Sequence, residues 1–214
     1  MMKKSGRYDT SKLVEVQFEP GSQGRVLKNL LGIKRKREMD EVESISLKIA
    51  LDKLPDSYDE NHRFIESDIK QMHKQWLGKI YDWAGKYRQV NVSKGNFSFA
   101  VARQVPGLMS DFEKSSLRKH TPCNFKYMKR IIQALAEVHV EFVLIHPFRE
   151  GNGRLARIIS TLMAAQARLP VLDFTDITGR KRKDYFNAIN RGLEMDYKPM
   201  ERIFSRIIER TSGT

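Results

Sequence analysis

The chain has 214 residues, of which 40% are hydrophobic and 30% are charged, and its formal net charge is +13. This length and composition are typical of one main globular domain with an extension, and they exclude a disordered or fibrous protein. No apolar run is long enough to span a membrane, and the single cysteine excludes an internal disulfide and a zinc site of several thiolates. The first residues lead into polar sequence where a secretion signal would be apolar, so we expect a cytoplasmic protein.

Two basic runs, residues 34–37 and 180–183, stand out in the charge pattern. A strongly positive chain suits a polyanionic partner. The runs contain no interleaved aromatic residues and no recognisable nucleic-acid module accompanies them, so the sequence does not favour nucleic-acid binding. An enzyme that uses ATP would also gain from a positive field.

Residues 1–38 are predicted to form an N-terminal arm, and residues 39–214 the main domain. Turn signals at Pro20, Gly21 and Ser22 precede an apolar cluster at residues 26–33. Ser11 could cap a short helix before this turn. The patterns do not determine whether the chain forms a homo-oligomer.

Apolar residues recur at helical spacing in seven stretches of the main domain. These stretches are residues 39–54, 66–84, 104–119, 124–145, 152–167, 178–192 and 199–210. Pro55 is expected to end the first stretch and Pro170 to close the fifth. His73 and His139 fall within such stretches, and we expect both to be packed or hydrogen-bonded core histidines. The sequence therefore predicts a mainly helical fold.

A different pattern lies between the second and third helical stretches. Residues 87–92 alternate, Lys94, Gly95 and Asn96 form a turn signal, and residues 97–100 again look extended. This predicts a small β-hairpin, which could pair with an extended peptide segment by strand addition.

The central motif is the stretch from His146 to Arg157. Gly151 and Gly153 flank Asn152 and permit a turn whose amides point into one concavity, at the start of a helix. Such a turn favours phosphate binding. Arg154 and Arg157 are three residues apart on one face of that helix, so both guanidinium groups could reach successive phosphoryl groups of a di- or triphosphate.

Two further groups add chemistry to this anion site. Glu150 could meet bound phosphates only through a cation, and Mg²⁺ that shares phosphate oxygens and waters is the usual solution. His146 is the one side chain in the motif that can accept a proton near pH 7. Beside an activated phosphate it would deprotonate an attacking hydroxyl group.

The motif resembles the signature of Fic-domain proteins, His-x-Phe-x-Asp/Glu-Gly-Asn-Gly-Arg-x-x-Arg, without a departure. Residues 83–88 and Phe99 with Ala100 resemble the family's flap region. Tyr185 and Phe186 resemble a late aromatic pair near the nucleotide base. The resemblance implies a helical Fic fold with a hairpin flap, which moves AMP from ATP to a Ser, Thr or Tyr hydroxyl of a target protein or of itself.

The resemblance also implies roles for single residues. His146 would be the base and Glu150 the Mg²⁺ ligand, while Asn152 and Gly153 would cradle the α-phosphate region and Arg154 and Arg157 would bind the outer phosphates. The flap would register the target segment through the hairpin residues Lys94, Gly95, Asn96, Phe97 and Phe99.

Many Fic proteins are restrained by a Ser/Thr-x-x-x-Glu-Gly/Asn helix whose glutamate pairs with the second motif arginine, here Arg157. Residues 11–16 and 205–210 resemble this segment except at its last position, and they make Glu15 and Glu209 the candidate inhibitory residues. We favour Glu15. A separate small antitoxin-like protein could instead supply the glutamate.

Three other functions stay open. A phosphotransferase like the Doc branch of the family would transfer the γ-phosphoryl group, although that branch departs from the Gly-Asn-Gly-Arg sequence. Removal of AMP from modified proteins is the second alternative, and a non-enzymatic binding module driven by the positive charge is the third.

Overall fold

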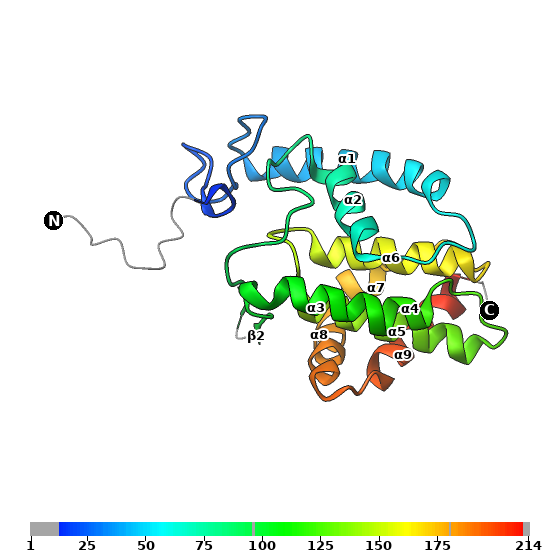
Figure 1. Ribbon diagram of the computed structural model, residues 1–214. Helices are drawn as coiled ribbons and strands as arrows, with labels where there is room; N and C mark the ends of the chain where they lie inside the picture. The colour runs from blue at the N-terminus through cyan, green and yellow to red at the C-terminus, as the bar shows by residue number, and fades with distance from the viewer. Residues whose placement is uncertain (1–12, 96, 180, 212–214) are drawn as a thin grey trace.

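The computed structural model describes residues 13–95, 97–179 and 181–211, and helices dominate them (Figure 1). The α-helices are α1 (Lys36–Ser57), α2 (Glu66–Leu77), α3 (Val105–Phe112), α4 (Arg118–His120), α5 (Met128–Ile145), α6 (Asn152–Gln166), α7 (Thr175–Thr178), α8 (Arg182–Arg191) and α9 (Lys198–Thr211). Short 3-10 segments occur at Val14–Val16, Ala102–Gln104 and Gly192–Glu194, and a π-helical segment, Glu113–Leu117, joins α3 to α4. The prediction of a mainly helical fold is confirmed.

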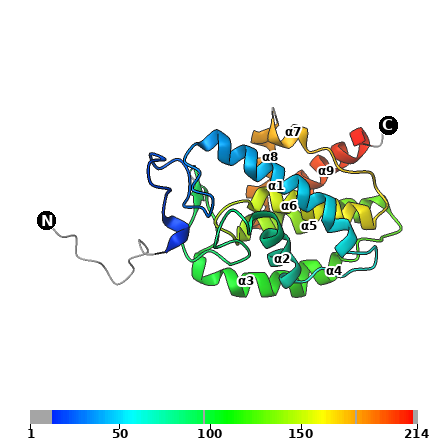
Figure 2. The same cartoon turned by 90° about the horizontal axis from the view of Figure 1, so that it is seen from above.

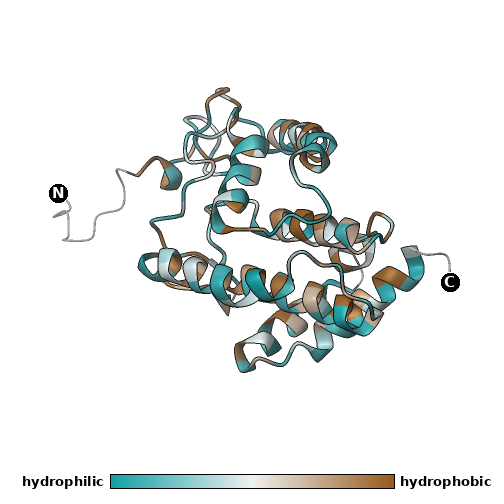
Figure 3. Cartoon of the chain, turned by 45° about the vertical axis from the view of Figure 1, so that its right-hand side comes forward, coloured by the Kyte–Doolittle hydropathy of each residue, from teal (hydrophilic) through white to brown (hydrophobic). Residues whose placement is uncertain are grey.

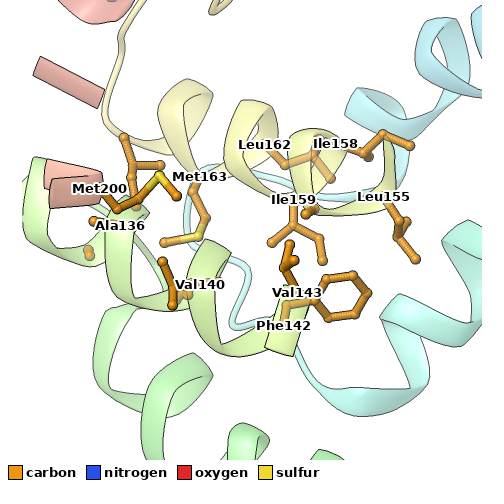
Figure 4. Close-up of a cluster of buried hydrophobic side chains, with 14 of the residues drawn as sticks. Ala136, Val140, Phe142, Val143, Leu155, Ile158, Ile159, Leu162, Met163 and Met200 are labelled. Atoms are coloured by element: carbon orange, nitrogen blue, oxygen red, sulfur yellow. The ribbon is translucent and has the colours of Figure 1, made fainter. Parts of the chain in front are cut away.

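Helices α5 and α6 form the centre of the domain, and α9 packs against α5 on another side. Ile159 and Met163 of α6 point toward Val140, Phe142 and Val143 of α5 (Figure 4). All five side chains are buried. Burial of a large apolar side chain contributes about 1.5–3 kcal/mol, so this pair of helices gives the His146 to Arg157 loop a rigid support at both ends.

A second cluster of buried side chains lies between α1, the end of α2 and the loop that follows α2. It includes Trp76 and Trp83, and Val26 and Ile33 of the N-terminal arm join it. Figures 1 and 2 show the arm at one end of α1. The described part of the arm is therefore packed against the helices, and the boundary at residue 38, which falls inside α1, stays a prediction.

Several helix ends differ from the predicted ones, and two of these differences have a clear physical reason. Pro55 lies inside α1, which continues to Ser57. A proline deprives only one carbonyl of its donor, and this close to a helix end the loss is small. Helix α2 ends at Leu77 instead of continuing to residue 84, although Ile80 and Trp83 are buried as expected. Ile80 and Trp83 continue the apolar spacing of α2 because they are buried, although they lie on a loop.

The predicted hairpin is present but shorter than expected. Strands β1 (Ser93–Lys94) and β2 (Phe97–Ser98) pair antiparallel, with Ser93 opposite Ser98 and Lys94 opposite Phe97. Residues 87–92 are not a strand, because the backbone amide of Arg88 donates to the carbonyl of Pro147 at 2.9 Å instead of to a partner strand. The alternating pattern in that stretch belongs to a loop that lies on the central motif.

The helices carry their apolar residues on the faces that are turned inward, as the hydropathy colours show (Figure 3). Among the described residues, no helix combines the length and the apolar character that a bilayer crossing needs.

Candidate functional site

One pocket of about 390 Å³ brings together most of the predicted site residues. It opens between the hairpin, the end of α5, the motif loop, the start of α6, and helices α7 and α8. Its lining consists of Val92, Ser93, Lys94, Phe99, Val143, His146, Arg149, Glu150, Asn152, Gly153, Arg157, Ile177, Arg182, Tyr185 and Phe186. Four cations, Lys94, Arg149, Arg157 and Arg182, face a single carboxylate, so the pocket suits an anion.

The motif loop is closed by its own asparagine. The side-chain oxygen of Asn152 accepts a hydrogen bond from the Phe148 amide at 2.9 Å, and the Asn152 side-chain amide donates to the Phe148 carbonyl at 2.8 Å. Asn152 is 1% exposed and Phe148 is fully buried. The Asn152 side chain therefore fixes the loop, which leaves the backbone of the turn to meet a ligand.

The two motif positions are occupied by glycine for different structural reasons. Gly151 has φ +85°, and a Cβ atom there would lie 2.7 Å from the Trp76 ring. Gly153 shows neither restriction, because a Cβ there would have its nearest neighbour, an Arg157 nitrogen, at 4.0 Å. Gly151 is thus required by the fold, while Gly153 keeps side-chain atoms away from the pocket.

The start of α6 presents free backbone amides beside Arg157. The first helical hydrogen bond runs from the Leu155 amide to the Gly151 carbonyl at 2.9 Å, so the preceding amides have no acceptor within the helix. Arg157 lines the pocket, and no described acid forms an ion pair with it. Burial lowers the pKa of Arg157, which nevertheless stays charged. Amides, helix dipole and guanidinium together give this end of α6 a positive potential that suits an anion.

Arg154 lies elsewhere, outside the pocket lining. Its guanidinium is 2.7 Å from the Glu43 carboxylate of α1, 3.7 Å from the Glu150 carboxylate, and 4.5 Å from the centre of a Trp76 ring. The structure therefore does not bring Arg154 and Arg157 together on a common ligand. The role of Arg154 as a phosphate ligand stays a prediction.

His146 has the geometry of a general base. Its Nδ1 lies 3.2 Å from the Val143 carbonyl, which can only accept, so Nδ1 carries the proton and Nε2 the lone pair. The Phe99 ring stacks on the imidazole with centroids 3.6 Å apart. Burial, with the charges of Arg88 and Lys94, lowers the pKa of His146 to about 4, so the ring is neutral at pH 7.

Glu150 is the acid of the pocket, and half of its side-chain surface is exposed. Its Oε1 accepts the Gly151 amide at 3.0 Å. Within the described ranges no three His, Cys, Asp or Glu side chains gather in a way that could hold a metal ion. A single carboxylate beside an anion site fits Mg²⁺ that takes its other ligands from phosphate and water.

The hairpin contributes two of its predicted residues to the pocket. Lys94 lies 4.9 Å from the centre of the Phe186 ring, and Phe99 covers His146. Phe97 contacts Phe99 edge to face at 5.1 Å. Gly95 is at the turn with φ +58°, and the prediction for Asn96 lies outside the described residues.

The two aromatic residues of α8, Tyr185 and Phe186, have different contacts. Phe186 faces the pocket between Lys94 and Arg182, whereas the Tyr185 hydroxyl donates to Nε2 of His139 at 2.8 Å. Nδ1 of His139 lies 3.0 Å from the Ser160 hydroxyl. Burial, followed by the charge of Arg157, lowers the pKa of His139 to about 3. The prediction that His139 is a satisfied core histidine is confirmed.

His73 is also a hydrogen-bonded core residue, as predicted. Nδ1 accepts the Gly85 amide at 2.8 Å, and Nε2 therefore carries the proton toward the Glu150 carbonyl at 3.1 Å. The ring stacks on Phe148 with centroids 4.0 Å apart. His73 thus connects α2 to the motif loop.

The two candidate inhibitory glutamates do not contact Arg157. The Glu15 carboxylate accepts the Gln89 amide at 2.7 Å, and the Glu15 carbonyl accepts from Nε of Arg149 at 2.8 Å. Glu209 is on the exposed face of α9 and accepts from the Ser205 hydroxyl at 2.7 Å. Glu15 is 5% exposed and attaches the arm to the site.

Three contributors to the site were given no individual role in the sequence analysis. Arg88 holds the backbone of His146, Glu43 holds Arg154, and Arg182 lines the pocket. Glu43 had a signal, since it occupies the same helical stripe as the buried Met39 and Ala50, and an acid on an apolar stripe needs a buried partner. The only sequence signal for Arg182 was its place in the basic run at residues 180–183.

Comparisons with known proteins found similar sequences. The Fic/DOC family model matches residues 63–164. Protein adenylyltransferase VbhT of Bartonella schoenbuchensis is 30% identical over 151 residues, which are 66% of this chain and 29% of that protein. A Sinorhizobium fredii protein, named Probable protein adenylyltransferase y4lH, is 27% identical over 195 residues, which are 88% of this chain and 93% of that protein.

The fold is similar to solved structures as well. The crystal structure of the BepC protein of Bartonella tribocorum, with bound AMPPNP, superposes with a TM-score of 0.67 at 21% identity and covers 85% of this chain and 91% of that one. The chain spans about a third or less of the length of the first curated relatives it matches.

Proposed function

Because the chain belongs to the Fic/DOC family, we propose that it is a protein adenylyltransferase, which moves AMP from ATP to a hydroxyl side chain of a target protein. The observation that carries this proposal is the neutral His146, whose Nε2 has no described protein partner, beside the free amides of α6 and Arg157 in one cationic pocket. A base next to a polyphosphate site is the arrangement that hydroxyl attack on phosphorus requires.

The nucleotide fits with its phosphates at the start of α6. The helix amides and Arg157 supply donors and positive charge, and the bare Cα of Gly153 lets a phosphate approach the backbone. Lys94, Arg149 and Arg182 add positive charge around the same space. Phe186 offers a ring face to the nucleotide base, the place that the resemblance to Fic proteins implies for it.

The transfer step follows from these positions. Nε2 of His146 accepts the proton of the attacking hydroxyl as its oxygen bonds to the α-phosphorus. The bond between the α-phosphorus and the bridging oxygen breaks, and pyrophosphate leaves with that oxygen. Amides and guanidinium stabilise the charge that develops on the phosphoryl oxygens. The Phe99 ring keeps the imidazole in place during the step.

Mg²⁺ is part of the proposal, with Glu150 as its protein ligand. It would neutralise phosphate charge and orient the outer phosphates. The exposed half of the Glu150 side chain and the lack of a described acid cluster support a site that ATP completes.

The hairpin is the proposed docking site for the target segment. Its two short strands carry Lys94 and Phe97 next to the pocket, and Phe99 follows in contact with His146. A target chain that pairs with this edge would bring its hydroxyl toward Nε2.

The proposal is tested with ATP labelled at the α-phosphate, purified protein, Mg²⁺ and a cell lysate. We expect label on protein, a mass increase of one AMP per site, and no label with His146→Ala. ATP labelled at the γ-phosphate should transfer nothing. Transfer only of the γ-label would instead show a phosphotransferase, and equal α-labelling by His146→Ala would refute the proposal.

A further inference from the structure

Arg88 is a buried cation beside the catalytic loop but outside the pocket. It is 2% exposed, and within the described ranges its guanidinium contacts no carboxylate. Its donors reach backbone carbonyls instead. These bonds run from Nε to His146 at 2.7 Å, from Nη1 to Val90 at 2.8 Å, from Nη2 to Ile145 at 3.3 Å, and from Nη2 to Ala100.

The position of this charge has an electrostatic reason. The carbonyls of Ile145 and His146 are at the C-terminal end of α5, where helical carbonyls lack donors and the helix dipole is negative. A cation there is stabilised, and the charge of the nearby Glu15 also favours the charged form of Arg88. Both effects offset the cost of burying an arginine that no carboxylate contacts. Arg88 therefore caps α5.

The cap acts on the backbone of His146 directly. His146 adopts φ 52° and ψ 59°, a left-handed conformation that costs a non-glycine residue about 1–2 kcal/mol. Its amide donates to Phe142 at 3.0 Å, its carbonyl accepts from Arg88, and the next carbonyl, of Pro147, accepts the Arg88 amide at 2.9 Å. These bonds hold the turn that directs the imidazole into the pocket.

The same guanidinium also holds both ends of the hairpin segment. Val90 precedes β1 and Ala100 follows β2, and both carbonyls accept from Arg88. The Ala100 amide adds a bond of 3.4 Å to the Leu144 carbonyl of α5. The hairpin and His146 are thus fastened at one point.

We propose that Arg88 is a positioning residue that sets the hairpin and His146 in a fixed relation, so that a hydroxyl docked on the hairpin meets Nε2. This inference rests on the proposed adenylyl transfer for its functional meaning. Its structural content does not, because Arg88 lines no part of the ATP pocket and its bonds can be measured without ATP.

Hydrogen exchange detected by mass spectrometry tests the structural content. In Arg88→Lys, which keeps the charge but loses the planar fork, amides of residues 89–101 and 144–149 should both exchange about tenfold faster or more, while the middle of α5 stays protected. Arg63→Lys is the control for the substitution itself, because the exposed Arg63 also donates to a carbonyl, that of Arg118 at 3.0 Å, far from the motif in sequence. It should change neither segment.

Acceleration of only one segment, or of neither, would overturn the proposal. If Arg88→Lys does not fold, hydrogen exchange of the wild-type protein still tests the proposal. As denaturant is added, the free energy of opening measured for residues 89–101 and for residues 144–149 should be the same and should fall with the same slope, because the two segments open as one cooperative unit. Separate openings of the hairpin and the His146 turn would contradict a shared fastening.

Kinetics with α-labelled ATP test the functional meaning. Arg88→Lys should lower kcat about 100-fold, the effect of a small misplacement of reacting groups, and leave KM for ATP within about twofold. A raised KM with unchanged kcat would assign Arg88 to nucleotide binding and overturn the proposal. If wild-type protein and His146→Ala label equally, adenylyl transfer fails, while the exchange experiment still decides the role of Arg88.

Discussion

The carboxylate of Glu43 lies 2.7 Å from the guanidinium of Arg154 and joins α1 to the first turn of α6. The Tyr81 hydroxyl donates to the same carboxylate at 2.7 Å, and the Glu43 carbonyl accepts the Trp76 indole at 3.0 Å. The Trp76 ring in turn lies under Arg154 and against Gly151. The second apolar cluster is therefore connected to the turn at Gly151 through one partly buried ion pair.

Replacing Glu43 with glutamine should destabilise the protein. The side-chain amide of Glu43→Gln can still accept from Tyr81, but Arg154 loses the nearer of its two carboxylates, in a site where the Glu43 side chain is only 6% exposed. We expect the free energy of unfolding to fall by about 1–3 kcal/mol, measured by urea denaturation.

Glu38→Gln is the control for this substitution. Glu38 pairs with Arg35 on the surface of the same helix, with side chains 46% and 86% exposed. An exposed pair contributes little, so this variant should stay within about 0.5 kcal/mol of the wild type. Equal losses in the two variants would mean that the Glu43–Arg154 pair contributes no more to the free energy of unfolding than an exposed pair does.

The structure brings most residues of the predicted motif to one pocket because they are contiguous in the sequence. His146, Glu150, Gly153 and Arg157 lie within one turn and the helix after it, so their proximity follows from local geometry. Arg88 and Glu43 reach the same place from distant parts of the chain. Only the packing of α1 and of the loop after α2 brings them there, and residue spacing carries no record of that packing.

Helix positions were predicted better than helix ends for a related reason. Burial sets the apolar spacing, and burial does not stop where helical hydrogen bonding stops. Trp83 is 5% exposed although it lies on a loop. Its position in the apolar pattern therefore predicted a further turn of α2 that is not there. The loop before β1 alternated for the same reason.

Alanine at the two motif glycines should separate folding from binding. Gly151→Ala places a Cβ at φ +85° and 2.7 Å from Trp76, so we expect a loss of about 2–4 kcal/mol in the free energy of unfolding. Gly153→Ala meets no such obstacle and should fold as stably as the wild type or slightly more so.

ATP binding distinguishes the second variant from the wild type. Gly153 lines the pocket, and its added methyl group would lie 4.0 Å from an Arg157 nitrogen, so affinity for ATP, measured by calorimetry, should fall about tenfold or more. Unchanged affinity would mean that the phosphates of ATP do not bind at the start of α6.

Stability should decrease as the pH falls below about 6.5. Burial lowers the pKa of His73 and His146 to about 4 and that of His139 to about 3. The unfolded chain therefore binds protons at these imidazoles before the folded chain does. Their contribution is complete above pH 6.5 and is lost as the pH falls toward 4.

His139→Gln isolates one of these imidazoles. Its side-chain amide can donate to Ser160 and accept from Tyr185, as His139 does, but it does not titrate. Between pH 6 and 5, the free energy of unfolding of this variant should fall less steeply than that of the wild type, by about 1 kcal/mol per pH unit. Parallel pH curves would show that His139 titrates normally.

Glutamine in place of Glu15 or Glu209 tests autoinhibition. Neither carboxylate contacts Arg157, so we expect each single variant to label itself from ATP at a rate within about twofold of the wild type. Glu15→Gln keeps an acceptor for the Gln89 amide, which separates loss of charge from loss of the arm contact. A tenfold rise in either variant would mean that its segment reaches Arg157 in solution. Unchanged rates in both, with strong labelling by the wild type, would leave restraint to a separate protein that supplies the glutamate.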